Sequence, residues 1–219
     1  MLTSASHSMN HEMNITFVDF FPGRNVNLML LTHNQTESRF LRKINKHISG
    51  SIISLDYTDF SEEEFEKKIK NFFVELNWQL YAMFRKNPET EFGTSLCLTV
   101  TFSDKIYFVQ FGRMLCGITS EDGFLSIGNA AENFSVKSME GLKLLGNKDK
   151  NIQVKVHSCE VYRSRKFIVF PAEKVQEITK MNFCDLLKDV ENLYSGNPFP
   201  YCIISGDKQV DTKKSRRKK

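Results

Sequence analysis

The sequence lacks several features that mark common protein classes. No apolar run approaches the roughly 20 residues of a membrane-spanning helix, and residues 1–11 are polar, without the apolar segment of a secretory signal peptide. The odd number of cysteines contains no CxxC pair, which argues against a disulfide framework and a zinc site. We therefore expect a cytoplasmic protein without a cofactor, whose thiols are buried and reduced: Cys97, Cys116, Cys159, Cys184 and Cys202.

Motifs for nucleotide binding and serine hydrolysis are also lacking. Gly112, Gly117 and Gly123 have the spacing of turns between strands and do not open a helix, so they form no phosphate-binding loop. No G-x-S-x-G segment indicates a nucleophile elbow. The metal-capable residues His157, Cys159 and Glu160 have no second half-site, and we interpret them as strand and turn.

What is present is the composition of one globular domain. The chain has 219 residues, of which 41% are hydrophobic and 26% charged. That length can bury roughly 70% of the surface of the unfolded chain. We expect a single domain over residues 13–207, a flexible lead over residues 1–12 and a disordered basic tail over residues 208–219.

The formal charge of +4 comes from the end of the chain. Without the six cations there, 24 basic residues face 26 acidic ones, so the body is nearly neutral. A dense basic run either keeps a terminus soluble or binds an anionic partner, such as nucleic acid or an acidic surface, and in a eukaryote it also fits nuclear import. The residues that would make this contact are Lys213, Lys214, Arg216, Arg217, Lys218 and Lys219.

Three segments have helical periodicity. From Thr36, apolar residues recur at helical spacing up to Ile48, and Ser49-Gly50 predicts the end of that helix. A longer helix begins after Ser61, where Ser61 and Glu64 form a capping box, and ends near Asn87. The acidic run at its start fits the helix dipole, which we prefer to cation binding. A last helix begins at Asn182.

The other apolar runs have the length and alternation of strands. We expect the runs from Met114 and from Gly123 to continue the antiparallel hairpin that precedes them. Because the strands come in runs interleaved with a few long helices, the sequence predicts an α+β domain with antiparallel sheet. The 19 phenylalanines fill its core or, alternatively, leave an exposed apolar docking patch. The predicted strands are Ile15–Phe21, Val26–Leu31, Thr94–Phe102, Lys105–Phe111, Met114–Ile118, Gly123–Ile127, Ile152–His157, Lys166–Phe170 and Tyr201–Ile204.

One hairpin resembles a known family. Gly93-Thr94-Ser95 followed by an apolar strand, and then Ile106 to Arg113, are similar to the G-T-T strand and L-Y-V-A-N-V-G-D-S-R-A strand of metal-dependent serine/threonine phosphatases of the phosphatase-2C type. The order of the later segments is also similar. The resemblance implies a four-layer α/β/β/α sandwich.

The same resemblance implies that the chemistry is missing. Family members hold two Mg²⁺ or Mn²⁺ ions with aspartates. The positions that match them carry Thr32-His33, Arg113, Pro171-Ala172 and Phe199-Pro200. We therefore predict a pseudophosphatase, a protein-binding or regulatory module in which Arg113 and His33 are candidate contacts to phosphate or to a partner.

Two alternatives stay open. The first is an active, divergent phosphatase whose metals bind other carboxylates, with Asp19, Asp56 and Asp122 as candidates. The second is a component of a nucleic-acid or ribonucleoprotein assembly that is held by the basic tail.

Overall fold

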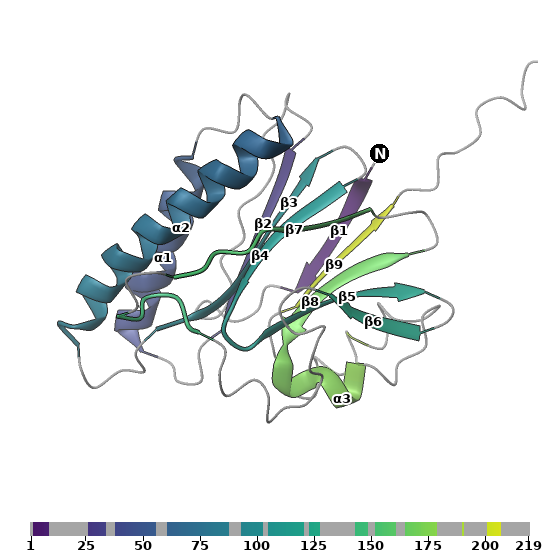
Figure 1. Cartoon of the computed structure of the whole chain (residues 1–219). Coiled ribbons are helices and arrows are strands. Elements are labelled where there is room, and N and C mark those ends of the chain that lie inside the picture. The colour runs from purple at the N-terminus through teal and green to yellow at the C-terminus, as the bar shows by residue number, and fades with distance from the viewer. Residues whose placement is uncertain are drawn as a thin grey trace, which may run out of the picture.

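The structure is a computed structural model, and it describes residues 2–8, 26–33, 38–55, 61–87, 93–102, 105–120, 123–127, 143–148, 152–160, 165–178, 190 and 201–206. Two antiparallel sheets pack face to face, and two helices lie on the outer side of one of them (Figure 1). The first sheet has the strand order β2(Val26–His33), β3(Ser95–Phe102), β4(Lys105–Phe111) and β7(His157–Glu160). The second has the order β1(Leu2–Ser8), β9(Tyr201–Gly206), β8(Lys166–Pro171), β5(Met114–Ser120) and β6(Gly123–Ile127).

The two helices cover the four-stranded sheet. Helix α1 (Arg39–Ile53) begins at Ser38, whose Oγ accepts a hydrogen bond from the Leu41 amide at 3.1 Å. Helix α2 (Glu62–Phe84) begins in the same way at Ser61, with the Glu64 amide as donor at 3.3 Å. Their apolar stripes are fully buried against the sheet: Leu41, Ile44, Ile48, Ile52, Phe65, Ile69, Phe73, Leu76, Leu80 and Phe84.

The sequence of β2 is apolar without alternation because the strand is buried on both faces. Leu28 and Leu30 belong to the core beneath the helices, whereas Met29 and Leu31 belong to the core between the two sheets. Successive side chains of a strand point to opposite faces, so a strand buried on both faces needs a continuous apolar run. The strand therefore lies in a middle layer of the fold.

Four local predictions differ from the structure. The lead expected to be flexible contains β1, which pairs antiparallel with β9. Helix α1 continues through Gly50 to Ile53. Strand β5 does not extend the β3–β4 hairpin but pairs with β6 and β8 in the other sheet. The strand expected to begin at Ile152 is β7, which begins only at His157.

Other predictions agree or fall outside the described residues. The strands predicted within residues 26–31, 94–102, 105–111, 114–118, 123–127, 166–170 and 201–204 are present. Val190, from the predicted last helix, is helical and fully buried. Most of that helix, the strand predicted over Ile15–Phe21 and the basic tail lie outside the described residues.

The large apolar side chains are almost all covered in the part of the chain that the structure describes. The exposed ones there are Ile53 and Trp78. The phenylalanines whose burial is described belong to the core or pack against it and form no exposed patch. None of the described helices is both long and apolar enough to span a bilayer.

Candidate functional site at the edge between the sheets

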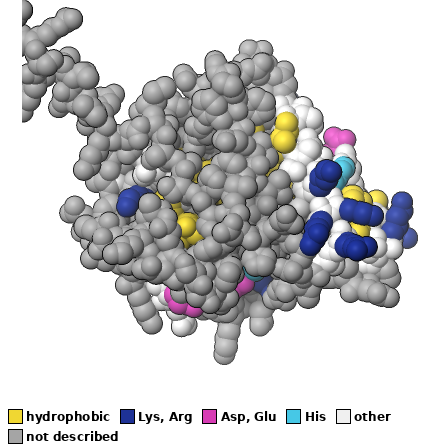
Figure 2. Space-filling view, turned by 180° about the vertical axis from the view of Figure 1, so that it is seen from behind, with side chains coloured by type: hydrophobic (Ala, Val, Ile, Leu, Met, Phe, Trp, Pro, Cys, Tyr) yellow, Lys and Arg dark blue, Asp and Glu magenta, His cyan; other side chains and the backbone are white. Residues whose placement is uncertain are grey.

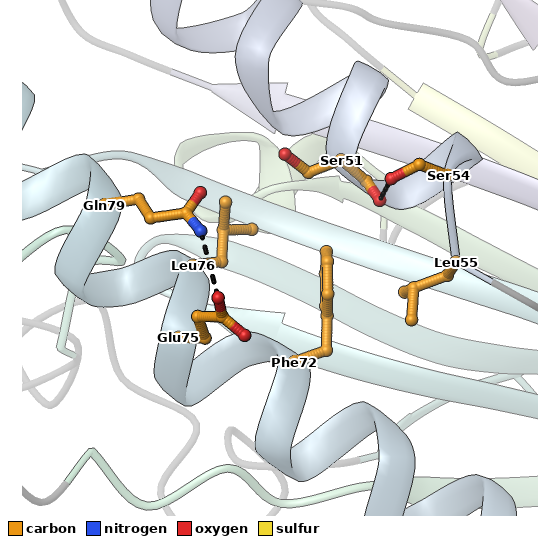
Figure 3. Close-up of a pocket in the computed structure, with 7 residues that line it drawn as sticks. All are labelled: Ser51, Ser54, Leu55, Phe72, Glu75, Leu76 and Gln79. Atoms are coloured by element: carbon orange, nitrogen blue, oxygen red, sulfur yellow. Dashed lines mark hydrogen bonds between the residues drawn. The ribbon is translucent and has the colours of Figure 1, made fainter.

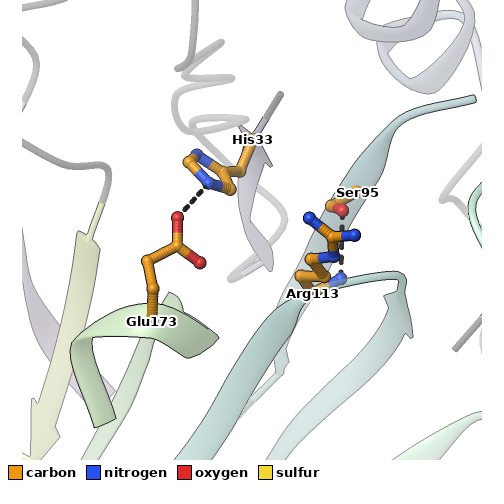
Figure 4. Close-up of polar contacts among 4 residues, drawn as sticks. All are labelled: His33, Ser95, Arg113 and Glu173. Atoms are coloured by element: carbon orange, nitrogen blue, oxygen red, sulfur yellow. Dashed lines mark hydrogen bonds and ion pairs between the residues drawn. The ribbon is translucent and has the colours of Figure 1, made fainter. Parts of the chain in front are cut away.

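Four elements meet where the chain crosses from one sheet to the other. His33 is the last residue of β2 and pairs with Ser95, the first residue of β3. Arg113 lies in the two-residue turn between β4 and β5, and Glu173 lies in the 3-10 turn η3 (Ala172–Lys174) after β8. We call His33, Ser95, Arg113 and Glu173 the edge cluster (Figure 4).

Backbone geometry holds this turn closely against β3. Gly112 has a φ of +63°, and a Cβ on it would lie 2.4 Å from Ser95 Oγ. Only glycine meets both conditions without strain. The turn is further fixed because the Arg113 amide donates to Ser95 Oγ at 3.0 Å, and the Arg113 carbonyl accepts from the Ala172 amide at 2.9 Å. Arg113 therefore has a defined position beside both sheets.

A hydrogen bond between His33 and Glu173 joins the two sheets at this edge. His33 Nε2 lies 2.5 Å from Glu173 Oε1, which bridges 140 positions of sequence. Figure 4 shows the imidazole and the carboxylate pointing toward one another. The side chain of His33 is only 13% exposed, whereas that of Glu173 is 50% exposed. The other ring nitrogen, Nδ1, is buried without a hydrogen-bond partner among the described residues.

Opposing effects set the pKa of Glu173. Burial, the largest effect, acts to raise the pKa. The hydrogen bond and charge of His33, a backbone hydrogen bond and the positive charge of Arg113 together outweigh burial, so the pKa lies below its ordinary value. The edge cluster thus contains one ionised carboxylate that is already paired.

These residues do not fit a binuclear site for hard divalent cations. Such a site needs several oxygen ligands that are free to bind metal. Here His33 occupies the carboxylate of Glu173, and the guanidinium of Arg113 disfavours a cation nearby. Within the described ranges, no group of three or more His, Cys, Asp or Glu residues is arranged to hold a metal. Asp19, Asp56, Asp122 and the segment Phe199-Pro200 lie outside those ranges.

The cluster has the residue types of a serine hydrolase triad but not its contacts. Ser95 Oγ accepts from the Arg113 amide, and His33 Nε2 is bound to Glu173. A nucleophile needs a base within hydrogen-bond reach. In Figure 4, Ser95 lies beside Arg113 and the ring of His33 is turned toward Glu173. The arrangement supports binding and structural roles better than acyl transfer.

The other residues singled out in the sequence form no further site. His157 stacks on Phe108 with the ring centroids 5.2 Å apart, and burial together with Lys155 lowers its pKa. Burial raises the pKa of Cys159 to about 12, and Glu160 lies on the exposed side of β7. Within the described residues, these three side chains are not part of any group that could hold a metal.

The described cysteines are free thiols, and three of them lie in the core between the sheets. Cys97 and Cys116 bring their sulfurs to 3.4 Å, and Cys202 contacts the sulfur of Met29 at 3.4 Å. Burial raises the pKa of Cys116 and of Cys202 well above the ordinary value. Burial of this kind makes a thiol unreactive, and the prediction that the cysteines at these positions are buried is confirmed.

Sequence comparisons do not assign a family. No family model matches the chain. No curated protein matches it either.

Solved structures, in contrast, match almost the whole chain. A serine/threonine phosphatase from S. agalactiae superposes with a TM-score of 0.72 at 11% identity, over 93% of this chain and 99% of that chain. For the serine/threonine phosphatase Stp1 from Staphylococcus aureus the TM-score is 0.64 at 11% identity, over 95% and 96% of the two chains. PppA, a key regulatory component of T6SS in Pseudomonas aeruginosa, gives a TM-score of 0.65 at 9% identity, over 94% and 99%. Such low identities show the fold alone, and the chain has the α+β phosphatase-2C fold that its hairpin motif predicted.

Proposed function

We propose that this protein is a pseudophosphatase, a module that keeps the phosphatase-2C fold for protein contacts and regulation and does not hydrolyse phosphate esters. The observation that carries the proposal is the edge cluster. At positions that match the metal-binding aspartates it presents the imidazole of His33 and the guanidinium of Arg113, and its one carboxylate, Glu173, is paired with His33. The cytoplasmic location expected from the sequence belongs to the same proposal.

Within this proposal, the edge cluster is a surface for a partner. Arg113 and His33 are the residues that would make its polar contacts. A phosphate group at the cluster is attracted by the guanidinium of Arg113. It is also repelled by the ionised carboxylate of Glu173, whose charge interacts with that of Arg113. A neutral or mixed-charge segment of a partner protein therefore fits the cluster better than a doubly charged phosphate.

Hydrolysis of a generic aryl phosphate by the full chain, with and without millimolar Mn²⁺, tests the proposal. We expect no turnover above the uncatalysed rate in either condition, while the S. agalactiae phosphatase assayed alongside turns over. Calorimetric titration with Mn²⁺ gives a second readout, in which we expect no binding heat. Circular dichroism confirms that the sample is folded.

Mn²⁺-dependent turnover by the chain would overturn the proposal. The protein would then be the divergent phosphatase considered above, and substitution of Asp19, Asp56 and Asp122 by Asn would identify the carboxylates that bind the metal. Turnover that persists in all three variants would direct the search to other acidic residues.

A further inference from the structure

Helix α1 carries charge of one sign only. Its 15 residues include no Asp or Glu, and four cations recur at helical spacing on its exposed face. We call these residues the basic strip: Arg39, Arg42, Lys43 and Lys46. Figure 2 shows Lys and Arg side chains gathered on the side of the molecule where the helices lie. The four residues span about 10 Å along the helix axis.

The stability of the helix does not explain this placement. Cations are favourable near the C-terminus of a helix and unfavourable near its N-terminus. In α1, Arg39 and Arg42 lie in the first turn, which has no acidic residue, and the last turn has no basic one. The distribution is the reverse of what the helix dipole favours, so an interaction outside the helix is the better explanation.

A groove lined by both apolar and polar side chains lies beside the strip. It has a volume of about 240 Å³ and opens between the C-terminal half of α1 and the middle of α2. Phe72 and Leu76 from α2 face Leu55 beyond the end of α1, and polar atoms form the rim (Figure 3). The volume is below that of a site for a drug-sized ligand and suits a single apolar side chain. The lining residues are Ser51, Ser54, Leu55, Phe72, Glu75, Leu76 and Gln79.

Contacts within the helix pair connect the strip to the groove. His47, next to Lys46 in sequence, bonds Gln79 Oε1 through Nε2 at 2.9 Å, and Gln79 Nε2 donates to Glu75 Oε1 at 3.4 Å. Ile53, which is 48% exposed, follows on the same side of α1 as the strip. Cationic and apolar binding elements therefore lie on one continuous surface.

The kind of partner follows from what this surface lacks. A helix that binds a membrane inserts its apolar face into the lipid. The apolar stripe of α1 is instead packed against the sheet, and Ile53 is its one exposed large apolar side chain. Single-stranded nucleic acid binds by stacking on aromatic side chains, and the exposed side of α1 has none. The groove also offers a nucleic-acid backbone no cation, because its lining residues include the carboxylate of Glu75 and no Lys or Arg.

We propose that the strip and the groove together dock a segment of a partner protein that has one apolar anchor residue and an acidic run beside it. The anchor occupies the groove, and the acidic side chains lie along the basic strip. Glu75 keeps an acidic residue away from the anchor position. From Ser51 to Arg39 the surface extends about 18 Å, which an extended peptide covers with about six residues. The inference deepens the proposed function and rests on it for the partner being a protein.

Fluorescence anisotropy of labelled peptides on the full chain tests this inference. The probes are synthetic peptides of about twelve residues with a central Leu or Phe and a Glu run within six positions on either side. One control series replaces the anchor by Ala, and another replaces each Glu by Gln. We expect saturable binding only for peptides with both features, weakening as salt rises from about 0.1 to about 0.5 M because the ion pairs are screened.

Matched variants assign the binding to this surface. Lys43→Gln with Lys46→Gln is expected to weaken binding about tenfold, since two rim ion pairs are lost. Lys67→Gln with Lys155→Gln removes the same charge from exposed sites elsewhere and is expected to leave binding unchanged. Ser54→Phe fills the groove and is expected to abolish binding, whereas Asn71→Phe, on the exposed face of α2, is not.

Several outcomes overturn the inference. The first is that none of the anchored acidic peptides binds. The second is that the two double lysine variants lose peptide affinity equally. The third is that a 20-base-pair duplex or phosphatidylserine vesicles bind in place of the peptides. The phosphatase assay is independent of these results. Turnover with Mn²⁺ while peptide binding persists removes the proposed function alone, and absent turnover with absent peptide binding removes the docking surface alone.

Discussion

At the scale of single residues, Glu173 connects charge to stability. Its folded-state pKa lies below the ordinary value of 4.5, because His33, a backbone hydrogen bond and Arg113 outweigh burial. A carboxyl group with a depressed pKa stabilises the fold above its unfolded-state pKa and loses that contribution as pH falls through its folded-state pKa. The His33–Glu173 pair is therefore a stabilising contact at neutral pH that acid removes.

The substitution Glu173→Gln measures this contact. We expect a loss of about 0.5–1 kcal/mol in the free energy of unfolding at pH 7, a modest value because the carboxylate is half exposed. The difference between the two proteins should shrink as pH falls below 4.5, where the wild-type carboxyl group becomes protonated. Urea unfolding at a series of pH values follows it.

Glu177→Gln is the matched control, since Glu177 is exposed and lies four residues further along. It should leave stability within about 0.5 kcal/mol of wild type at every pH. Equal effects of the two substitutions would mean that net charge, and not the pair with His33, determines the result.

The sequence indicates part of the edge cluster and misses part of it. His33 and Arg113 stand at positions where the resemblance expects metal ligands, so a comparison of motifs finds them. Glu173 follows Pro171-Ala172, where the motif expects an acid. Strand β8 ends at Pro171, two residues before this carboxylate. Only the packing of the two sheets brings Glu173 to His33 across 140 positions. A local motif cannot predict a contact between residues so far apart in the sequence.

At the scale of elements, α1 shows where local signals fail. Ser49-Gly50 is a common end of a helix, yet α1 continues to Ile53 because Ile52 extends the buried stripe of Ile44 and Ile48. Burial of that side chain favours one more helical turn by about 1.5–3 kcal/mol, which exceeds the cost of about 1 kcal/mol for a glycine inside a helix. Gly50 therefore stands in a helix interior and weakens it.

Gly50→Ala is expected to raise the free energy of unfolding by about 0.5–1 kcal/mol. Alanine has the higher helix propensity, and a Cβ at this position meets no atom within 4 Å. Chemical unfolding monitored by circular dichroism measures the gain. Gly112→Ala is the contrasting control and should destabilise, because its added Cβ would lie 2.4 Å from Ser95 Oγ. A loss of stability in Gly50→Ala would contradict the continuous helix.

The positions of elements with strong periodicity can be predicted from the sequence, whereas the pairing of strands within the sheets cannot. The apolar runs of β3, β4 and β8 are bounded by turn residues, so their positions were predictable. The runs of β4 and β5 look like neighbours in one sheet, because only Gly112-Arg113 separates them. Which of two sheets a strand joins depends on both of its faces and on strands far along the chain. The sequence of β1 is mostly polar and does not alternate between polar and apolar residues, so no local pattern predicts this strand.

At the scale of the whole molecule, β1 is an edge strand of the five-stranded sheet and covers β9. It pairs with β9 at six positions, and β9 in turn pairs with β8. Strand β9 contributes Cys202 and Ile204 to the core between the sheets. Without β1, the backbone of β9 would be an unpaired edge, and such edges promote association between chains.

Deletion of residues 1–8 is therefore expected to lower the free energy of unfolding by about 1–3 kcal/mol, given six residue pairs and a net value of about 0.5 kcal/mol for a backbone hydrogen bond. We further expect the truncated chain to self-associate as concentration rises, because β9 is exposed to pairing with a second copy. Thermal unfolding and sedimentation velocity measure the two effects.

Deletion of residues 213–219 is the control, because it removes a segment of similar length from the other end of the chain. It should change neither the stability nor the association state. If the N-terminal truncation is as stable and as monomeric as the full chain, the pairing of β1 with β9 contributes nothing to the fold, and the expectation of a flexible lead is restored.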